Sequence, residues 1–535
     1  MRRLLLIVLG AVALAAMVLY PIARRHMHAE AGMTNRHGVR ATLAAIGAVL
    51  VGGRSTAALP VPPTMIGVSV SLPTYSGRTR ALANLAAGSN WFAKDHHVLG
   101  PDEVDEQGNI KKLLPGVPLS RVMTPPNLTE KGPTIHCTWQ GKGTLKVGGA
   151  MVRGGRGDAH GFTYILNNLP GPDGAPPVSV LTVSDMDATD PIRDIDCRET
   201  TISATARIDP AFAAALHGFR ILRFMDWQNS NENAPITWRT RHLPGAIDTT
   251  HRDGVAIEDM IALAKDTGTD AWFNMPYNGD DDYYAHFAQL VHDSLPPDRT
   301  VYVEMGNEVW NHGFKVAGQA QREGQAANLS SNANEAGLLR YAQRLAHVMD
   351  IWKKVYADRP HSLVRVAACQ NSAWCAKTVL GYQDTARHVD AMATAPYFGM
   401  ALNKTVYATP ADMFVALDGE IDHTLDIALK VKAVAAQFGK RYIAYEGGQH
   451  LIFNDVAFEQ QVQRDPRMYD AYKKYLDIWR TQIGDTISLW TASGRISRYG
   501  GWGLVEYIGQ PLSDAPKMRA VQDEIALTQS GKSAH

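Results

Sequence analysis

The chain has 535 residues, of which 45% are hydrophobic and 20% are charged, as in a globular protein with a large core. Its 53 Lys and Arg residues equal its 53 Asp and Glu residues, so the formal net charge is zero. The basic excess expected of a nucleic-acid-binding protein is therefore absent. The length predicts about two to four domains, or one large barrel with additions.

Residues 1–58 read as a targeting segment. Leu4 to Ala23 form an apolar run between two pairs of arginines, long enough to span a bilayer as a membrane anchor. A second, shorter run from Ala41 to Gly53 follows basic residues and precedes small ones, which is the pattern of a secretory signal peptide that would start at Met33. Either interpretation places the body of the protein outside the cytoplasm, secreted or periplasmic, with a possible anchor in the inner membrane.

The four cysteines, Cys137, Cys197, Cys369 and Cys375, lack the C-x-x-C spacing of zinc or redox sites. In an oxidising compartment we expect two disulfides, Cys137–Cys197 and Cys369–Cys375. The alternative is four free, buried thiols.

Along the chain, the first predicted strand is the β-branched run at residues 63–73, within a first barrel segment at 59–100. Residues 101–208 are then dense in Gly and Pro, with brief β-type runs such as FTYIL and VSVLTV. This composition, with short β-type runs between turns, predicts a small antiparallel sandwich inserted after strand one. Both members of the expected Cys137–Cys197 bridge fall inside it.

From residue 209 to residue 525, strands alternate with amphipathic helices, which predicts parallel βα units, and residues 526–535 would form a tail. With the first strand, the count reaches the eight strands that close a (β/α)8 barrel. The seven further predicted strands lie at residues 218–227, 270–277, 300–308, 362–370, 389–399, 440–448 and 486–493.

Reactive residues of such barrels stand at the carboxyl ends of the strands. Strand four ends at Asn307-Glu308 and strand seven at Glu446, so the two glutamates should face each other across one barrel mouth. Glycoside hydrolysis needs this pair, because one carboxyl must stay protonated for the leaving oxygen while the other is ionised. If the reaction retains configuration, the two carboxyls should lie about 5–5.5 Å apart.

This pattern resembles the clan of retaining glycoside hydrolases with (β/α)8 barrels that includes the family 5 cellulases and mannanases. The resemblance covers roughly residues 64–100 and 209–525 and implies that Glu308 is the acid/base and Glu446 the nucleophile. It also implies supporting roles around the sugar for Asn307, Arg223, Tyr397 and Trp490, and an inward position for Glu304.

The phrases EMGNEVWN and AYEGGQH are closer to a secreted, cellulase-like branch that is sometimes described as cellulose-binding. Two departures from family 5 stand out. Strand three ends in Met-Pro-Tyr-Asn where family 5 usually has a His, and Val309 rather than Pro follows Asn307-Glu308.

Three more rim residues are candidates for substrate binding: Tyr277 after strand three, Trp310 beside Glu308, and His450 in EGGQH. Structural interpretations remain open for several candidates. Glu308 could interact with a helix N-terminus, Arg223 could form an ion pair with Glu304 or Glu308, and Trp310 could cap the barrel. Tyr397 and Trp490 could be packing residues.

The sequence thus predicts an exported, monomeric, retaining glycoside hydrolase that acts on a β-linked oligo- or polysaccharide without metal or cofactor. The alternative is an inactive carbohydrate-binding protein on the same barrel, with the β insertion as its binding module.

Overall fold

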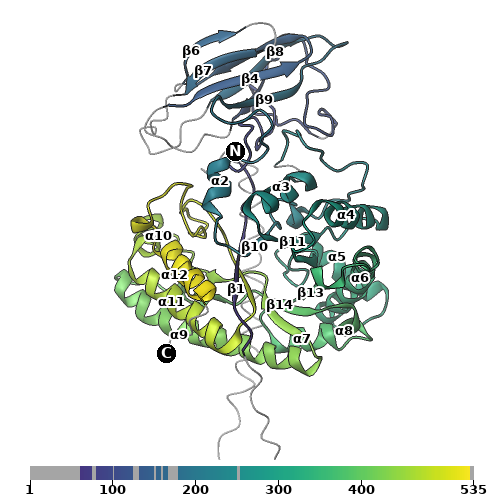
Figure 1. Ribbon diagram of the computed structural model, residues 1–535, viewed down its shortest axis with the longest axis vertical. Helices are drawn as coiled ribbons and strands as arrows, with labels where there is room; N and C mark the ends of the chain where they lie inside the picture. The colour runs from purple at the N-terminus through teal and green to yellow at the C-terminus, as the bar shows by residue number, and fades with distance from the viewer. Residues whose placement is uncertain are drawn as a thin grey trace, which may run out of the picture.

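The computed structural model describes residues 61–74, 80–100, 102–123, 132–149, 152–157, 161–166, 179–249 and 254–530. The predicted signal or anchor segment, including Leu4–Ala23 and Met33, lies outside these residues. Among the helices that are described, none is both long and apolar enough to cross a membrane. Figure 1 shows two parts, a barrel ringed by helices and a β domain beyond one end of it.

The (β/α)8 barrel predicted from the sequence is confirmed. Eight parallel strands close on themselves because β1 pairs with both β10 and β18. In barrel order they are β1 (Met65–Ser69), β10 (Ile221–Arg223), β11 (Asp270–Met275), β12 (Val301–Met305), β13 (Leu363–Ala368), β14 (Ala391–Thr394), β16 (Arg441–Ala444) and β18 (Thr486–Leu489).

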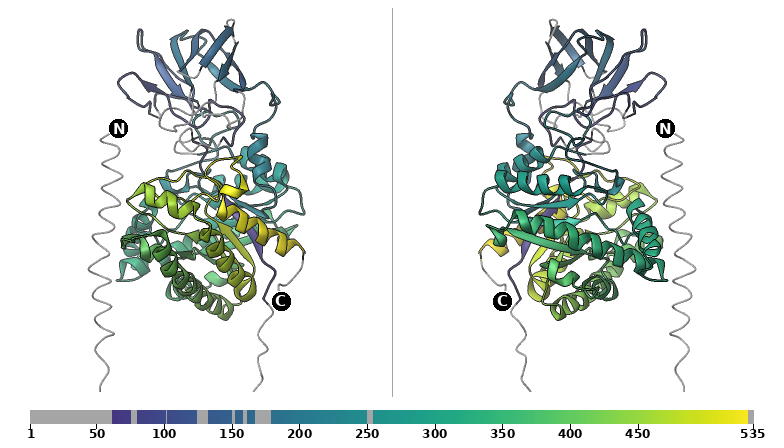
Figure 2. Two further views of the ribbon diagram at one scale, coloured as in Figure 1. Left: turned by 90° about the vertical axis from the view of Figure 1, so that its left-hand side faces the viewer. Right: turned by 90° about the vertical axis from the view of Figure 1, so that its right-hand side faces the viewer.

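The helices form the outer layer around these strands (Figures 1 and 2). The last one continues beyond residue 525, where the sequence analysis ended the barrel. The helices are α2 (Pro210–Ala215), α3 (Ile257–Thr267), α4 (Asp281–Ser294), α5 (Lys315–Ala326), α6 (Ala333–Val355), α7 (Ala373–Leu380), α8 (Thr385–His388), α9 (Pro410–Gln437), α10 (Val456–Arg464), α11 (Arg467–Ile478) and α12 (Pro516–Ser530).

Alternation along the strands decides what lies inside the barrel. Ile221 belongs to the small cluster that fills the barrel, whereas its neighbour Leu222 belongs to the large cluster between strands and helices. Inside, the rings of Trp272 and Tyr302 stack with centroids 5.1 Å apart. Arg223, two residues beyond Ile221, therefore also points inward, nearer the carboxyl ends of the strands, and it is the first element of the candidate site.

The chain between β1 and α2 forms the inserted β domain, which lies beyond the carboxyl end of β1 (Figure 1). It contains two four-stranded antiparallel sheets, β2-β3-β8-β5 and β6-β7-β4-β9. Its strands are β2 (Phe92–Ala93), β3 (Leu119–Val122), β4 (Thr134–Gln140), β5 (Gly143–Gly148), β6 (Val152–Gly157), β7 (Gly161–Leu166), β8 (Val180–Met186) and β9 (Arg193–Glu199).

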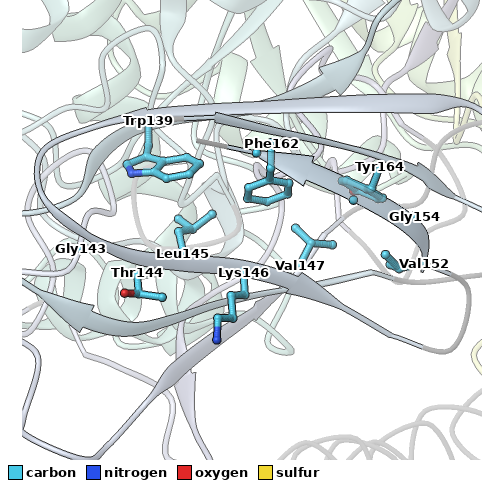
Figure 3. A pocket seen from close by; sticks show the side chains of 12 residues that line it. Trp139, Gly143, Thr144, Leu145, Lys146, Val147, Val152, Gly154, Phe162 and Tyr164 are labelled. Atoms are coloured by element: carbon cyan, nitrogen blue, oxygen red, sulfur yellow. The ribbon is translucent and has the colours of Figure 1, made fainter. Parts of the chain in front are cut away.

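The core of the β domain lies between its two sheets. Strand β4 alternates exposed and buried residues, as expected when one face packs and the other meets water. Near the edge strands β5 and β6 the sheets leave a cavity of about 620 Å³. Figure 3 shows its aromatic side chains Trp139, Phe162 and Tyr164 on one side and Leu145 and Val147 on the other.

Both expected disulfides are confirmed. Cys137–Cys197 joins the paired strands β4 and β9, with Cα atoms 4.0 Å apart. Cys369–Cys375 closes the turn between β13 and α7, with Cα atoms 6.0 Å apart. The first bridge spans 60 residues of sequence and the second only 6.

The two disulfides should contribute unequally to stability. The loop-entropy model gives about 4 kcal/mol for Cys137–Cys197 and about 2 kcal/mol for Cys369–Cys375, because a longer loop loses more freedom in the unfolded chain. In urea unfolding followed by circular dichroism, the double alanine variant of the first pair should therefore lower the midpoint more than that of the second. Equal shifts for the two variants would contradict this explanation.

Candidate active site

The turn after β12 directs Glu308 to the mouth of the barrel. Gly306 has φ +66°, and a Cβ there would lie 2.8 Å from Cγ2 of Val309. Glu308 itself has φ +43°, in the left-handed region that non-glycine residues rarely adopt. Such a conformation costs on the order of 1–3 kcal/mol and is concentrated at functional sites. The strand thus ends at Met305, and the turn brings Glu308 to a cavity at the barrel mouth.

Glu446 follows β16 and is held by two donors. Arg223 Nη1 donates to Glu446 Oε1 at 2.5 Å, and the Tyr397 hydroxyl donates to Oε2 at 2.9 Å. Tyr397 is brought there by β15 (Tyr397–Phe398), which pairs with β17 (Gly448–Gln449) just after Glu446. A guanidinium and a hydroxyl thus each contact one oxygen of this carboxyl group.

Arg223 contacts several residues of the site from inside the barrel, where its side chain has 0% exposure. It donates to Glu304 and, through Nη2, to Oδ1 of Asn307 at 2.9 Å. Burial alone would lower the pKa of Arg223, but the charges of Glu304 and Glu446 outweigh it and raise that pKa. The ion pair with Glu304, considered above as a structural alternative, exists together with the contact to Glu446.

Asn307, the residue before Glu308, is held by hydrogen bonds to both the oxygen and the nitrogen of its side-chain amide. Its Oδ1 accepts from Arg223, and its Nδ2 donates to Oδ1 of Asn231 at 2.9 Å. Asn231 lies in the short 3₁₀ helix Ser230–Glu232 after β10. The amide therefore has a defined orientation beside Glu308 before any substrate binds.

The surroundings of Glu308 differ from those of Glu446. Glu308 is buried and accepts from the Tyr445 hydroxyl at 3.0 Å and from Asn311 Nδ2 at 2.7 Å, both neutral donors. Burial raises the pKa of Glu308 to about 7, with a further contribution from the charge of Glu446. The Trp310 indole donates to the Tyr445 hydroxyl at 3.2 Å and so supports this arrangement. One carboxyl of the pair is thus suited to carry a proton near neutral pH.

Both glutamates line one cavity of about 610 Å³ at the carboxyl ends of the strands. The sequence-predicted residues that the structure brings to this cavity are Asn307, Glu308, Trp310, Tyr397, Glu446, His450 and Trp490. Arg223 lies beneath it, in contact with Glu446.

Tyr277 is not brought to this cavity. Its side chain is buried, its hydroxyl donates to Glu323 of α5 at 3.0 Å, and the Arg344 guanidinium lies 4.7 Å from its ring centroid. The chain turns outward after β11, because α5 and α6 supply the polar partners of this tyrosine. We therefore correct its predicted role in substrate binding to a packing role between helices.

Three residues of the site were missed by the sequence analysis: Trp502, Tyr445 and Asp226. Trp502 lines the cavity from the long segment after β18, where no strand or helix signalled its position. Tyr445, directly before Glu446, could have been noticed from that position alone. Burial raises the pKa of Asp226 to about 7, and the charge of Glu446 adds to the shift. Asp226 is thus a further carboxyl close to the pair, in addition to Glu304.

Three rings form one wall beside Glu446. The His450 ring meets the Trp502 indole edge-on with centroids 4.6 Å apart, and both contact the Tyr397 ring. Burial lowers the pKa of His450, which favours the neutral imidazole. The wall is therefore uncharged, aromatic and braced against the tyrosine that holds Glu446.

A buried polar network lies behind this wall. Lys517 of α12 donates to Gln463 at 2.9 Å and to the carbonyl of Gly501, next to Trp502. Gln449, next to His450, donates to the same carbonyl at 2.9 Å. The C-terminal helix thereby fixes the two chain segments that carry the ring wall.

Among the described residues, no group of His, Cys, Asp and Glu side chains is arranged to hold a metal ion. Neither a protein-family model nor a curated protein matches this sequence.

Several solved structures are similar to this chain. One is the GH51 arabinofuranosidase from Xanthomonas axonopodis pv. citri, at 12% identity and a TM-score of 0.40 over 61% of this chain and 67% of that one. Another is the endo-1,4-beta-D-mannanase from Thermotoga petrophila RKU-1, at 15% identity and a TM-score of 0.32 over 58% of this chain and 94% of that one.

A third is the beta-glucosidase from Thermotoga maritima, at 11% identity and a TM-score of 0.35 over 59% of this chain and 84% of that one. The chain spans 58% of the alpha-L-arabinofuranosidase from the same organism. Similarities of this degree carry no information on the reaction.

Proposed function

We propose that this protein is a retaining glycoside hydrolase acting on a β-linked glycan. The observation that carries the proposal is the asymmetry of two carboxyls in one cavity: Glu446 is paired with a buried cation, whereas Glu308 is buried among neutral donors. Retaining glycosidases need this difference, because one carboxyl must attack as an anion while the other delivers a proton.

In the first step, a carboxylate oxygen of Glu446 attacks the anomeric carbon and forms a glycosyl ester. The bond from that carbon to the leaving oxygen breaks, and the oxygen takes the proton of Glu308. Asn307, oriented by Arg223 and Asn231, donates to the hydroxyl next to the anomeric carbon. The charge lost from Glu446 in the ester leaves Arg223 still paired with Glu304.

In the second step, Glu308 is a carboxylate and takes a proton from water. The resulting hydroxide equivalent attacks the anomeric carbon, and the ester bond to Glu446 breaks. Both glutamates return to their starting states, and two displacements leave the sugar with its original configuration. No metal or cofactor takes part in this scheme.

A carbohydrate substrate is supported by the lining of the cavity. Trp310, Tyr397, Trp490 and Trp502 provide ring faces, and Asn307 with its neighbours provides hydrogen-bonding groups. Flat amphipathic rings beside a few fixed polar groups suit a sugar, which has apolar C–H faces and hydroxyl edges. The two disulfides fit a protein that acts outside the cytoplasm.

A panel of aryl β-glycosides and β-linked polysaccharides tests the proposal. We expect hydrolysis of at least one member, with nuclear magnetic resonance showing the β-anomer as the first product. A first product of α configuration would show an inverting reaction. If no member is hydrolysed while a polysaccharide is bound, the inactive carbohydrate-binding protein described above is the better description.

The pH profile should report the proton on Glu308. Its raised pKa of about 7 means that the acid form is present below this value and is lost above it. On a glycan with a poor leaving group, kcat/KM should therefore fall as the pH rises through about 7. In the Glu308→Ala variant, assayed with an activated aryl glycoside, this alkaline decrease should be absent. A decrease that persists would point to Asp226 instead.

A further inference from the structure

The turn between β13 and α7 carries an exposed aromatic side chain next to the candidate active site. Trp374 has 54% exposure, whereas each of the other ten tryptophans among the eleven of the chain is buried or half-buried. It is the second residue of α7, which follows the carboxyl end of β13 after the turn at residues 369–372. Trp374 is therefore at the catalytic end of the barrel.

Trp374 is close to the cavity along the chain. Gln370 and Asn371, from the same turn, line the cavity. Because consecutive Cα atoms are 3.8 Å apart, the Cα of Trp374 is within about 11 Å of that of Asn371. A short run of sugar units can span this distance, so a chain that leaves the cavity over Asn371 can reach the Trp374 ring.

The turn is braced on several sides. The Cys369–Cys375 disulfide closes it, and the Ser372 side chain caps α7 by accepting from the amide of Cys375. Asn371 accepts from the Thr394 hydroxyl and donates to the carbonyl of Thr424, both at 3.3 Å. An exposed tryptophan on a fixed turn retains little freedom to lose when it binds, which favours a recognition role.

The position also indicates which end of the substrate would meet Trp374. Strand β13 is paired with β12, which leads to Glu308, whereas Trp490 and Trp502 follow β18 on the other side of Glu446. Glu308 gives its proton to the leaving oxygen, so the turn lies toward the leaving-group part of the substrate.

We propose that Trp374 is a binding subsite for the leaving-group side of a polymeric glycan, which stacks on its exposed ring after passing Gln370 and Asn371. This inference rests on the proposed function and narrows its substrate to a chain that extends beyond the cavity. The face of an indole offers such a chain apolar contact with sugar C–H groups at a wet surface.

The test compares short and long substrates. Wild type and Trp374→Ala are assayed on the best aryl glycoside of the panel and on β-linked gluco- and manno-oligosaccharides from disaccharide to hexasaccharide. We expect KM of the wild type to fall with chain length, and Trp374→Ala to raise KM for the longest chains about tenfold, the scale of one lost aromatic anchor. The aryl glycoside should be cleaved equally by both.

Two further variants distinguish loss of this subsite from an unspecific effect of removing an exposed apolar side chain. Val406→Ala removes an apolar side chain that is 97% exposed and should leave the length dependence unchanged. The double Cys369→Ser, Cys375→Ser variant releases the turn and should weaken cleavage of long chains while sparing the aryl glycoside. If Trp374→Ala retains the wild-type length dependence, the subsite is refuted while the proposed function stands.

If the wild type cleaves no substrate, the proposed function fails, and the subsite is tested by binding. Migration in native gels that contain soluble β-linked glucan or mannan should then be slowed for the wild type and not for Trp374→Ala. Equal migration of the two proteins would refute the subsite.

Discussion

Glu446→Ala is expected to abolish turnover and to regain part of it with azide, giving the α-glycosyl azide from a β-glycoside. Without the carboxylate no glycosyl ester forms, and the loss should be roughly 10⁴- to 10⁶-fold, as when other covalent enzymes lose their nucleophile. Azide fits the space left by the carboxylate, beside Arg223 and Tyr397, and attacks the anomeric carbon once. A single displacement inverts the configuration.

Product analysis by nuclear magnetic resonance distinguishes the two azide anomers. Glu232→Ala is a matched control, because Glu232 is an exposed carboxylate that pairs with Lys315 on the surface, an interaction of small energy. The control should keep wild-type kcat and need no azide. Activity of Glu446→Ala within about tenfold of the wild type would be far too high for loss of a nucleophile and would remove Glu446 from the mechanism.

Glu308→Ala is expected to separate substrates by their leaving groups. Aryl glycosides with good leaving groups need no proton and should still form the glycosyl ester, whereas cleavage of natural glycans should fall about 10²- to 10⁴-fold. Azide should now attack the ester on Glu446 and give the β-glycosyl azide, since two displacements have occurred. The structural reason is that Glu308 has neutral donors around it and a pKa raised by burial.

Stopped-flow release of the aryl group should show a burst in Glu308→Ala, because hydrolysis of the ester loses its general base. Azide should remove the burst by raising the steady-state rate. If the azide products of the two variants have the anomers exchanged, the roles of Glu308 and Glu446 are reversed. If neither variant loses more than about tenfold, these residues are not a catalytic pair.

Sequence patterns were sufficient for the barrel because its signals are local. Each strand is a short apolar run, and each helix shows its own periodicity, as in residues 254–268 after the predicted strand at residues 218–227. Parallel strands share one direction, so residues at their carboxyl ends meet at one rim whatever the details of packing. The positions of Glu308 and Glu446 at one cavity follow from this rule.

The cysteine pairs were predictable for a different reason. The chain has four cysteines in the part predicted to be exported. Two fall inside the predicted β domain and two lie close together in sequence, which favours one pairing. The structure confirms both. The spacing of Cys369 and Cys375 could not show that Trp374, between them, is exposed, because exposure depends on the packing of the whole surface.

The tertiary structure decided the contacts made by side chains. Tyr277 follows β11 as Tyr397 follows β14, yet the Tyr277 hydroxyl donates to Glu323 in the helix layer and the Tyr397 hydroxyl donates to Glu446. Trp502 comes from a segment without regular structure, and its position depends on Gln449 and Lys517. Rotamers and loop paths of this kind result from contacts between residues far apart in sequence.

The chain by itself thus determined the (β/α)8 topology, the inserted β domain, the disulfide pairs and the two carboxyls at one mouth, because these follow from local apolar periodicity and strand direction. Only the tertiary structure decided how the carboxyls differ. Arg223 reaches Glu446 across 223 positions of sequence, and burial raises the pKa of Glu308. Ionisation depends on solvent exclusion and on neighbouring charge, and both arise only when the barrel closes.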